Sequence, residues 1–455
     1  MGVRHISPCA GSWYPGDRME LEGLLEDRFA ESERRTDPLL GGALGYVVPH
    51  AGPAWSGTVA AAAYRSLREQ LAERVVVLGF SHRGGPAGVV APDVDAIATP
   101  WGDVELDGGF GGFPRAAEAR VCDHSLEIQL PFVQKAAPAA RVTALYVGRL
   151  DAEGRRRSAQ ALAAAWQPGT VFIASSDFTH YGRSFGYVPF PADGNVRRRL
   201  HELDEDSIDA AGSLDSELFL ETVAASGDTL CGTDPIALLL DTLTALGAAD
   251  VYQARLDYQT SGELNGDYSH SVSYAALGYF RRRAFDLSEA ECAALRAGAM
   301  AALGGVPRPT GPLLAGLAAH RGVFVSLHRA GELLGCMGNC FGGGPLGEDV
   351  PRLAVAAATE DPRFLPASLE DGPIDVEISV LTPFRRVRGP AQVEVGRHGV
   401  FLRAGGSGLL LPQVATERGW TAEQFLHALT RKASTGPRAW RDPRARLFVF
   451  EAQVF

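Results

Sequence analysis

Short runs of β-branched residues alternate with helical segments through the N-terminal part of this chain. Strands are predicted at residues 46–48, 74–78, 142–147 and 171–174, and alanine-rich helices at 58–73 and 158–166. Strands that alternate with helices in this way need crossover connections, which place helices on both faces of a sheet. The N-terminal part is therefore predicted to be an α/β domain.

The chain is too long for one hydrophobic core. It has 455 residues, and single cores stop growing beyond about 250–300 residues. A capping-box pattern, Ser288 followed by Glu291, starts a new helix just after the arginine run 281–283. A Pro/Gly-rich turn at 304–312 is followed by predicted strands at 322–327 and 374–381 and helices at 350–359 and 421–432. We therefore expect an α/β domain at residues 1–285 and an α+β domain at 286–455.

Composition and charge exclude several classes of protein. The net charge of −11 disfavours a general nucleic-acid-binding protein. Six cysteines in a chain of this length are too few for a disulfide framework. The start has no apolar segment typical of a signal peptide, and the apolar stretch 236–248 is broken by Asp241. We expect a cytoplasmic protein with neither nucleic acid nor membrane as a partner.

Four polar clusters stand directly after a predicted strand or before a predicted helix. They are Pro49-His50-Ala51-Gly52, Ser81-His82-Arg83-Gly84, Ser175-Ser176-Asp177-Phe178-Thr179-His180 and Cys231-Gly232-Thr233-Asp234-Pro235. The carboxyl ends of strands line the ligand crevice of open α/β sheets, so the first three clusters are expected to converge. Cys231 could join them from a helix start, where the dipole favours a thiolate.

Such a convergence would suit a divalent metal. Two neutral imidazoles with a thiolate or carboxylate bind iron(II), zinc or copper. Asp177 and His180 would serve as a ligand or an acid/base partner. Ligating histidines also need acceptors that orient their rings, and Asp177, Asp123 or Glu127 could supply them.

Each of these residues also has a structural interpretation. A single histidine after a strand is more often a hydrogen-bonded loop residue than a ligand, and Cys231 can be a plain buried thiol. The stretch 123–127 reads most simply as a helix start, with Asp123 at the cap and Glu127 in the first turn. The residues alone leave both interpretations open.

Eight segments of the N-terminal part carry a family resemblance. They are GSWYPGD (11–17), PHAGPAWSG (49–57), LGFSHRG (78–84), TPWGDVELD (99–107), DHSLEIQLPF (123–132), SSDFTHYG (175–182), CGTDPI (231–236) and YQTSGELNGDYSHSVSYAALGYF (258–280). In this order they resemble the Memo family, protein B of the AmmeMemoRadiSam system. The resemblance implies a fold akin to class III extradiol dioxygenases. It also implies a metal site of His50, His82 and Cys231, with Asp177 and His180 lining the same pocket.

One departure from the dioxygenases bears on the reaction. A cysteine stands where those relatives carry a carboxylate ligand, and a thiolate changes the charge balance of the iron. This argues against plain extradiol cleavage.

The C-terminal part resembles the AMMECR family, protein A of the same system. The segments that carry this resemblance are GVFVSLHRAGELLGCMG (322–338), DPRF (361–364), DVEISVLTP (375–383) and LLPQVATERGWTAEQFLHALTRKA (410–433). Leu334 replaces an arginine of the family pattern. Cys336 and Cys340 form a single pair, which cannot complete a zinc site; Cys336 is predicted to pack, with a role as a pocket nucleophile as the alternative. The glycine run 342–344 is predicted to be a flexible loop that borders the active site.

Together these features favour an enzyme with one metal ion, iron(II) ahead of zinc or copper. The expected substrate is a small phenolic or enolisable molecule, and the reaction makes or breaks a carbon–carbon bond or oxygenates a ring. His180, oriented by Asp177, is expected to act as general acid/base, and the AMMECR-like domain to complete the pocket. Two alternatives stay open: a non-catalytic metal-binding scaffold that serves a radical-SAM partner protein, and a zinc hydrolase that uses the same ligands.

Overall fold

The chain folds into two compact units, Met1–Ala284 and Phe285–Phe455. The computed structural model describes residues 3–247, 249–304 and 314–455. Nearly all of the Pro/Gly-rich turn expected at 304–312 lies outside the described residues. Among the described residues, no helix is both long and apolar enough to cross a membrane. Each unit is described by itself below.

The first unit is built on a large mixed sheet. In its described part, nine strands join in the order β10 (His180–Gly182), β12 (His270–Arg281), β2 (Ala43–Val48), β9 (Thr170–Ser175), β3 (Arg74–Gly79), β8 (Arg141–Val147), β4 (Val89–Pro92) and β7 (Arg115–Ala116), with β11 (Val251–Thr260) paired to β12. Neighbours among β2, β9, β3 and β8 are parallel. Every residue of β2 and β9 is buried, as expected for parallel strands covered on both faces.

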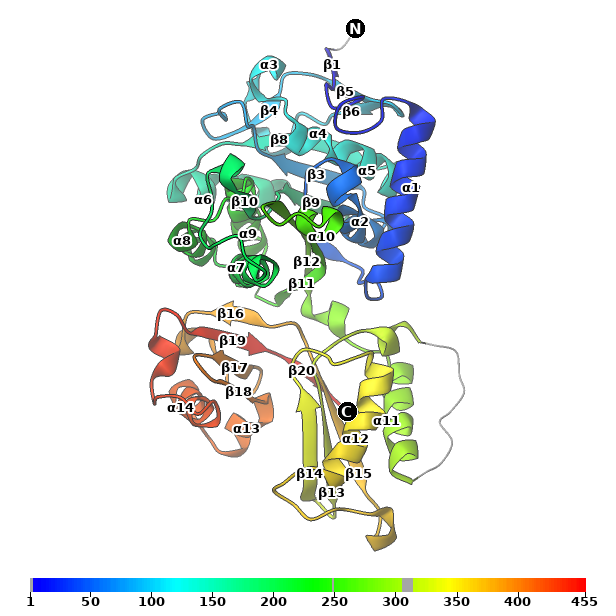
Figure 1. Ribbon diagram of the computed structural model, residues 1–455, viewed down its shortest axis with the longest axis vertical. Helices are drawn as coiled ribbons and strands as arrows, with labels where there is room; N and C mark the ends of the chain where they lie inside the picture. The colour runs from blue at the N-terminus through cyan, green and yellow to red at the C-terminus, as the bar shows by residue number, and fades with distance from the viewer. Residues whose placement is uncertain (1–2, 248, 305–313) are drawn as a thin grey trace. The chain divides into compact units, whose positions relative to one another are not determined.

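Helices cover the two faces of this sheet. Figure 1 shows α1 (Arg18–Arg35), α2 (Pro53–Glu69) and α5 (Gln129–Ala136) on one side, and α6 (Ala152–Ala165), α7 (Val196–Ala211), α8 (Ser216–Ser226) and α9 (Thr233–Ala245) on the other. The short helices α3 (Glu118–Val121), α4 (His124–Glu127) and α10 (Ser261–Asn265) lie in connections. The predicted α/β architecture is confirmed for this unit.

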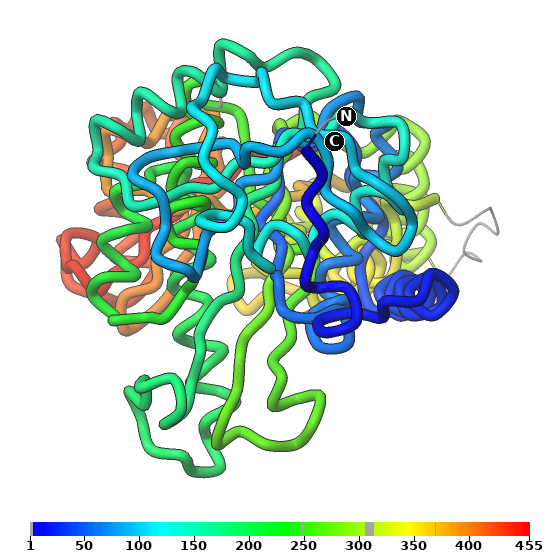
Figure 2. Tube along the Cα trace, turned by 90° about the horizontal axis from the view of Figure 1, so that it is seen from above, coloured from blue at the N-terminus to red at the C-terminus, as the bar shows by residue number. Residues whose placement is uncertain are grey.

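Two peripheral features complete the first unit. The N-terminal strand β1 (Arg4–Ile6) forms a small sheet with β5 (Ala96–Thr99) and β6 (Gly102–Glu105). β10 pairs antiparallel with the start of β12, and Gly182 lies opposite His270. The loops beside this pairing lie together and project from the rest of the unit (Figure 2).

The predicted elements are present, and three helices start earlier than predicted: α2, α6 and, in the second unit, α12 (Leu346–Thr359), which was predicted at 350–359. α2 starts at Pro53 because proline is well suited to the first helical turn. α6 starts at Ala152 because the Asp151 side chain caps it by accepting from the Gly154 amide at 2.7 Å. The charged residues between this cap and the alanine run hid the true start.

The second unit is α+β, as predicted. In its described residues, one sheet has the order β14 (Glu332–Asn339), β13 (Val323–Arg329), β15 (Asp375–Leu381), β20 (Ala452–Val454), and another the order β16 (Arg385–Val387), β19 (Arg446–Phe450), β17 (Gly399–Arg403), β18 (Ser407–Leu410). α11 (Glu289–Gly304) and α12 (Leu346–Thr359) share a core with the first sheet. α13 (Pro412–Glu417) and α14 (Ala422–Lys432) pack on the second. The predicted capping box is present, because Glu291 accepts from the Ser288 amide at 2.8 Å.

Candidate metal centre

His50 follows β2 and is almost completely buried, with 2% of its surface exposed. Its Nδ1 lies 3.1 Å from Ser175 Oγ at the end of the adjacent strand β9. The Ser175 hydroxyl donates its hydrogen to the Ser125 carbonyl and accepts from Gln129 Nε2 at 2.8 Å. Because that hydroxyl has one hydrogen and has already donated it, His50 Nδ1 must be the donor in their contact. This leaves His50 Nε2 with a lone pair.

His82 follows β3, and its ring is held by a carboxylate. Asp123 Oδ1 lies 2.9 Å from His82 Nδ1, and Asp123 Oδ2 accepts from the His82 amide at 3.2 Å. Asp123 also caps α4 by accepting from the Ser125 amide. It is therefore both the helix cap that the sequence predicted and an acceptor that orients a histidine. As in His50, the imidazole Nδ1 is engaged and Nε2 is available to a ligand.

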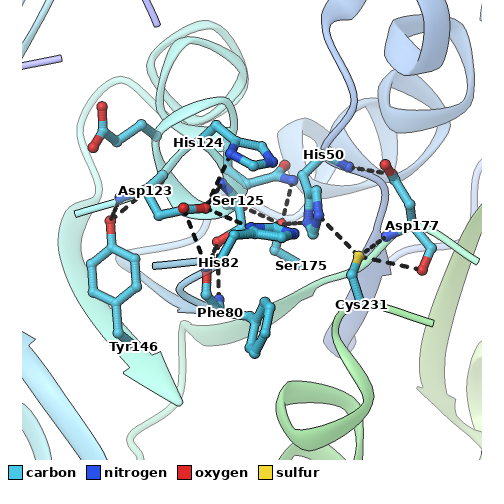
Figure 3. A network of polar contacts seen from close by, with 12 residues as sticks. His50, Phe80, His82, Asp123, His124, Ser125, Tyr146, Ser175, Asp177 and Cys231 are labelled. Carbon is cyan, nitrogen blue, oxygen red and sulfur yellow. Dashed lines mark hydrogen bonds and ion pairs between the residues drawn. The ribbon is translucent and has the colours of Figure 1, made fainter. Parts of the chain in front are cut away.

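Cys231 comes to the same place from the start of α9. Its Sγ lies 3.0 Å from His50 Nε2 and accepts from the Asp177 amide at 3.3 Å (Figure 3). The approach depends on Gly232, because a Cβ at this position would lie 2.4 Å from the Ser175 carbonyl oxygen. The sequence pair Cys-Gly thus lets the helix start touch the end of β9.

Burial opposes the thiolate that the helix start at Cys231 would favour. Burial, reinforced by the nearby charge of Asp177, raises the pKa of the Cys231 thiol far above its ordinary value. Desolvation therefore outweighs the dipole of α9, and the thiol must lose its proton when a cation binds.

His124 is the residue that the sequence interpretation left out of the centre. It begins α4, and its ring stacks on that of His82 with centroids 4.4 Å apart. One ring nitrogen from each of His50, His82 and His124 lies within 4.8 Å of the others. The sequence pattern indicated a helix start at 123–127 as the simplest interpretation. Its pairing of Asp123 with a following histidine was the available signal.

Burial favours the neutral form of His50 and His124. It lowers the pKa of His50 to about 3, and the adjacent rings of His82 and His180 contribute in the same direction. Burial likewise lowers the pKa of His124 to about 4. Burial of Asp123 opposes its ionisation, but hydrogen bonds from His82 and the Ser125 amide prevail and lower its pKa to about 2. The neutral imidazoles of His50 and His124 near the ionised carboxylate of Asp123 form a good environment for a cation.

Asp177 and His180 both lie at the centre, but not in the predicted relationship. Asp177 Oδ1 accepts from the amides of His50 at 2.8 Å and Ala51 at 3.2 Å, so it fixes the backbone of the loop after β2. The ring of His180 is held instead by two backbone carbonyls, Phe178 at 2.9 Å and Thr229 at 3.2 Å from Nδ1. Carbonyls only accept, so Nδ1 carries the hydrogen and Nε2 is the basic atom.

A buried pair of acids lies behind His180. The hydroxyl of Thr179 is 2.6 Å from Asp204 Oδ1 and 2.8 Å from Asp228 Oδ1. One hydroxyl hydrogen cannot serve both oxygens, so a proton on the acid pair is needed for the second contact. Burial, together with the charge of Asp204, raises the pKa of Asp228 to about 7. The pair therefore retains a proton near neutral pH.

A Memo-like family model matches residues 4–278. The chain belongs to the Memo family. An AMMECR1 model matches residues 293–455, so one chain carries both domains, as the resemblance implied. The Memo domain is related in fold to the extradiol dioxygenases and offers groups of metal-binding side chains.

Several known proteins match parts of this chain. A MEMO1 family protein of Methanopyrus kandleri is 33% identical over 293 residues, which are 60% of this chain and 97% of the relative. Human protein MEMO1 is 28% identical over 284 residues, 59% of this chain and 94% of the relative. An uncharacterized Pyrococcus horikoshii protein of known crystal structure is 36% identical and covers 35% of this chain and 86% of its own, with a TM-score of 0.33.

In the AMMECR1 domain, the glycine run, Leu334 and Cys336 make contacts that support the local fold. Asp349 accepts from the amides of Gly343 at 2.8 Å and Gly344 at 3.1 Å. The glycine run is thus held around a carboxylate and is not the flexible loop that was predicted. Leu334, at the position of the family arginine, packs against the core beneath α12. Cys336 lies in β14 and donates its amide to Asp361 at 2.9 Å.

Proposed function

We propose that the Memo domain is a metal-dependent enzyme whose ion is held by His50, His82 and Cys231. The observation that carries this proposal is the short distance from Cys231 Sγ to His50 Nε2, 3.0 Å. Both histidines engage Nδ1 elsewhere and leave Nε2 for a ligand. Histidine and cysteine donors suit iron(II), zinc and copper, and we favour iron(II) because of the fold relationship to extradiol dioxygenases.

The residues around the three donors suit a small substrate that binds through oxygen. Such an ion would supply a Lewis acid for a phenolate or enolate oxygen. Because Nδ1 of His180 is fixed by two carbonyls, Nε2 would take the proton from the substrate hydroxyl and return it later. Asp177 would hold the backbone that carries His50. Trp13, stacked on His124 with centroids 4.1 Å apart, would form an aromatic wall for a ring substrate.

The proposed reaction makes or breaks a carbon–carbon bond next to the coordinated oxygen. A thiolate in place of a carboxylate makes the ion a poorer partner for oxygen-dependent cleavage, so the non-oxidative version is favoured.

Metal content tests the ligand set first. Protein purified without oxygen should contain about one iron per chain. His50→Ala and Cys231→Ser should both lose it. His201→Ala, a partly exposed histidine of α7 outside the centre, is the matched control and should keep it. Metal that survives in both ligand variants would contradict the proposed centre, and zinc in its place would favour a hydrolase.

Turnover tests the chemistry separately. Phenolic and enolisable compounds are incubated with the iron-loaded chain, with and without oxygen, and products are followed by mass spectrometry. His180→Ala should keep its iron and lose turnover by roughly 10²–10⁴-fold, the range of a general acid/base. Full metal loading without turnover on any such compound would favour a scaffold for a radical-SAM partner protein.

A further inference from the structure

A second group of metal-binding side chains lies in the first unit, apart from the three proposed ligands. His5, Cys122 and Glu127 each offer one donor atom within 4.8 Å of the other two. They come from β1, the residue after α3, and the end of α4. Cys122 and Glu127 are buried, with 2% and 0% exposed, and the His5 side chain is 14% exposed. The proposed reaction does not use this group, and the sequence pattern indicated Glu127 only as a first-turn residue or as an acceptor for a ligating histidine.

Glu127 provides the independent sign of a missing ligand. Its Oε1 lies 3.1 Å from His5 Nε2. Its Oε2 is buried and has no hydrogen-bond partner. An ionised carboxylate with one oxygen unsatisfied is costly in a protein interior. A pairing with His5 alone therefore leaves half of the carboxylate uncompensated, whereas a cation can contact both oxygens.

The surroundings of His5 match those of a metal-binding histidine. Its other nitrogen, Nδ1, lies 3.4 Å from Glu118 Oε2. This contact is an ion pair and not a hydrogen bond, because Glu118 Oε2 has no hydrogen-bond partner, but a carboxylate beside the far nitrogen still favours a ligating histidine. His5 therefore has Glu118 on one nitrogen and the Cys122–Glu127 pair on the other.

We propose that His5, Cys122 and Glu127 bind a zinc ion and supply three of the four donors of its tetrahedral site. Nitrogen, sulfur and carboxylate oxygen are the donors that zinc prefers. The donor atoms of a tetrahedral zinc site lie about 3.3–3.8 Å apart, and the three donor atoms here lie within 4.8 Å of one another, so small side-chain movements would bring them to a zinc ion. A zinc ion with one thiolate, one carboxylate and a neutral imidazole has no net charge, which suits a buried place.

Zinc at this place would tie the N-terminal strand to the segment that supports the first centre. Cys122 directly precedes Asp123, which orients His82. Glu127 shares α4 with His124. The thiol of Cys9 borders the group: burial first and then the charge of Glu127 raise the pKa of Cys9 to about 12. The role inferred for the zinc is stability of this corner, independent of the proposed reaction.

Cobalt titration of the full chain tests the proposal without interference from the first centre. The background variant carries His50→Ala, His82→Ala and Cys231→Ser, which removes the donors assigned to catalysis. Metal-free background protein should bind about one Co²⁺ per chain and show a sulfur-to-cobalt charge-transfer band. Adding Cys122→Ser should abolish that band. Cys340→Ser, a thiol of the second unit, is the matched control and should leave the band unchanged.

Two further measurements keep the result interpretable if Cys122→Ser fails to fold. His5→Gln changes a partly exposed strand residue and should weaken cobalt binding at least about tenfold, as loss of a ligand does. Zinc should raise the melting temperature of the background variant and leave that of its His5→Gln form nearly unchanged. The proposal is overturned if the background variant gives no thiolate band, if the band survives Cys122→Ser, or if His5→Gln binds cobalt as tightly as the background.

Discussion

Buried aspartates do opposite kinds of work in the two domains. In the Memo domain, Asp123 accepts from His82 Nδ1, so its charge orients and supports a side chain that is free to bind a ligand. In the AMMECR1 domain, Asp349 is held by the Asn339 amide group, two glycine amides and Arg352. These hydrogen bonds hold the glycine loop in place. The same residue type, equally buried, therefore marks a candidate site in one domain and a structural joint in the other.

This difference gives a rule for interpreting such motifs. A buried carboxylate whose partners are backbone amides and arginine stabilises local structure. A buried carboxylate whose partner is an imidazole leaves the second nitrogen of that ring available. The following changes test this distinction, from the largest expected effect to the smallest.

Of these changes, Asp349→Ala in the AMMECR1 domain should lower the free energy of unfolding the most. It removes the acceptor for two glycine amides and leaves Arg352 without its partner, so we expect a loss of about 3 kcal/mol in the free energy of unfolding. Urea unfolding followed by tryptophan fluorescence measures it. The exposed neighbour Glu348→Ala is the control. Unchanged stability would show that the carboxylate does not hold the loop.

Asp123→Asn should weaken metal binding while leaving the fold intact. The amide can still cap α4, but it no longer supports the charge-assisted contact with His82. We expect metal affinity to fall about 10–100-fold, the usual effect of removing a partner of a ligating histidine. Competition with a chelator measures it, and Asp103→Asn on the surface is the control. If Asp123→Asn lowered stability more than affinity, the contrast between the domains would fail.

Asp228→Asn should change how stability depends on pH. Its pKa is raised in the folded protein to about 7 from an ordinary value of 3.8. The stabilisation this gives is complete below about pH 4 and is lost as pH rises through about 7, because the folded state binds more protons there. An asparagine does not titrate, so the stability of the variant relative to the parent should rise progressively between pH 4 and 8.

Denaturant titrations at several pH values measure that gain. Asp27→Asn, on the exposed side of α1, should show none. A constant difference between Asp228→Asn and the parent at all pH values would refute a shared proton at the acid pair.

Leu334→Arg should have the smallest effect. Leu334 is only partly buried where it packs against the core, so an arginine stem can cover the same surface while its guanidinium reaches water. We expect less than about 1 kcal/mol of destabilisation, measured by thermal unfolding. A larger loss would show that this domain has adapted its core to the leucine.

Much of the candidate centre follows from where strands end. His50 and His82 come two and three residues after the ends of β2 and β3. Both strands pair with β9, so the convergence of the two histidines follows from parallel pairing. Cys231 can approach the end of β9 because the next residue, Gly232, has no side chain that would collide with that strand.

Contacts made by side chains across the fold were beyond sequence reasoning. The stacking of His124 on His82 depends on how α4 meets the end of β3, which no local pattern specifies. The replacement of Asp177 by backbone carbonyls as the partner of His180 depends on the segment at Thr229. Helix starts were missed where a cap preceded charged residues, as at Asp151.

The stacking of Trp13 on His124 also gives the protein an optical reporter. The two rings are nearly parallel, with an interplanar angle of 9°, and Trp13 is 43% exposed. Indole emission is sensitive to an open-shell ion close by, whereas closed-shell zinc has no redox or d-electron transitions of its own. The fluorescence of Trp13, isolated by comparison with Trp13→Phe, would therefore distinguish iron or copper from zinc at the neighbouring histidines in a cuvette, without labelling the chain.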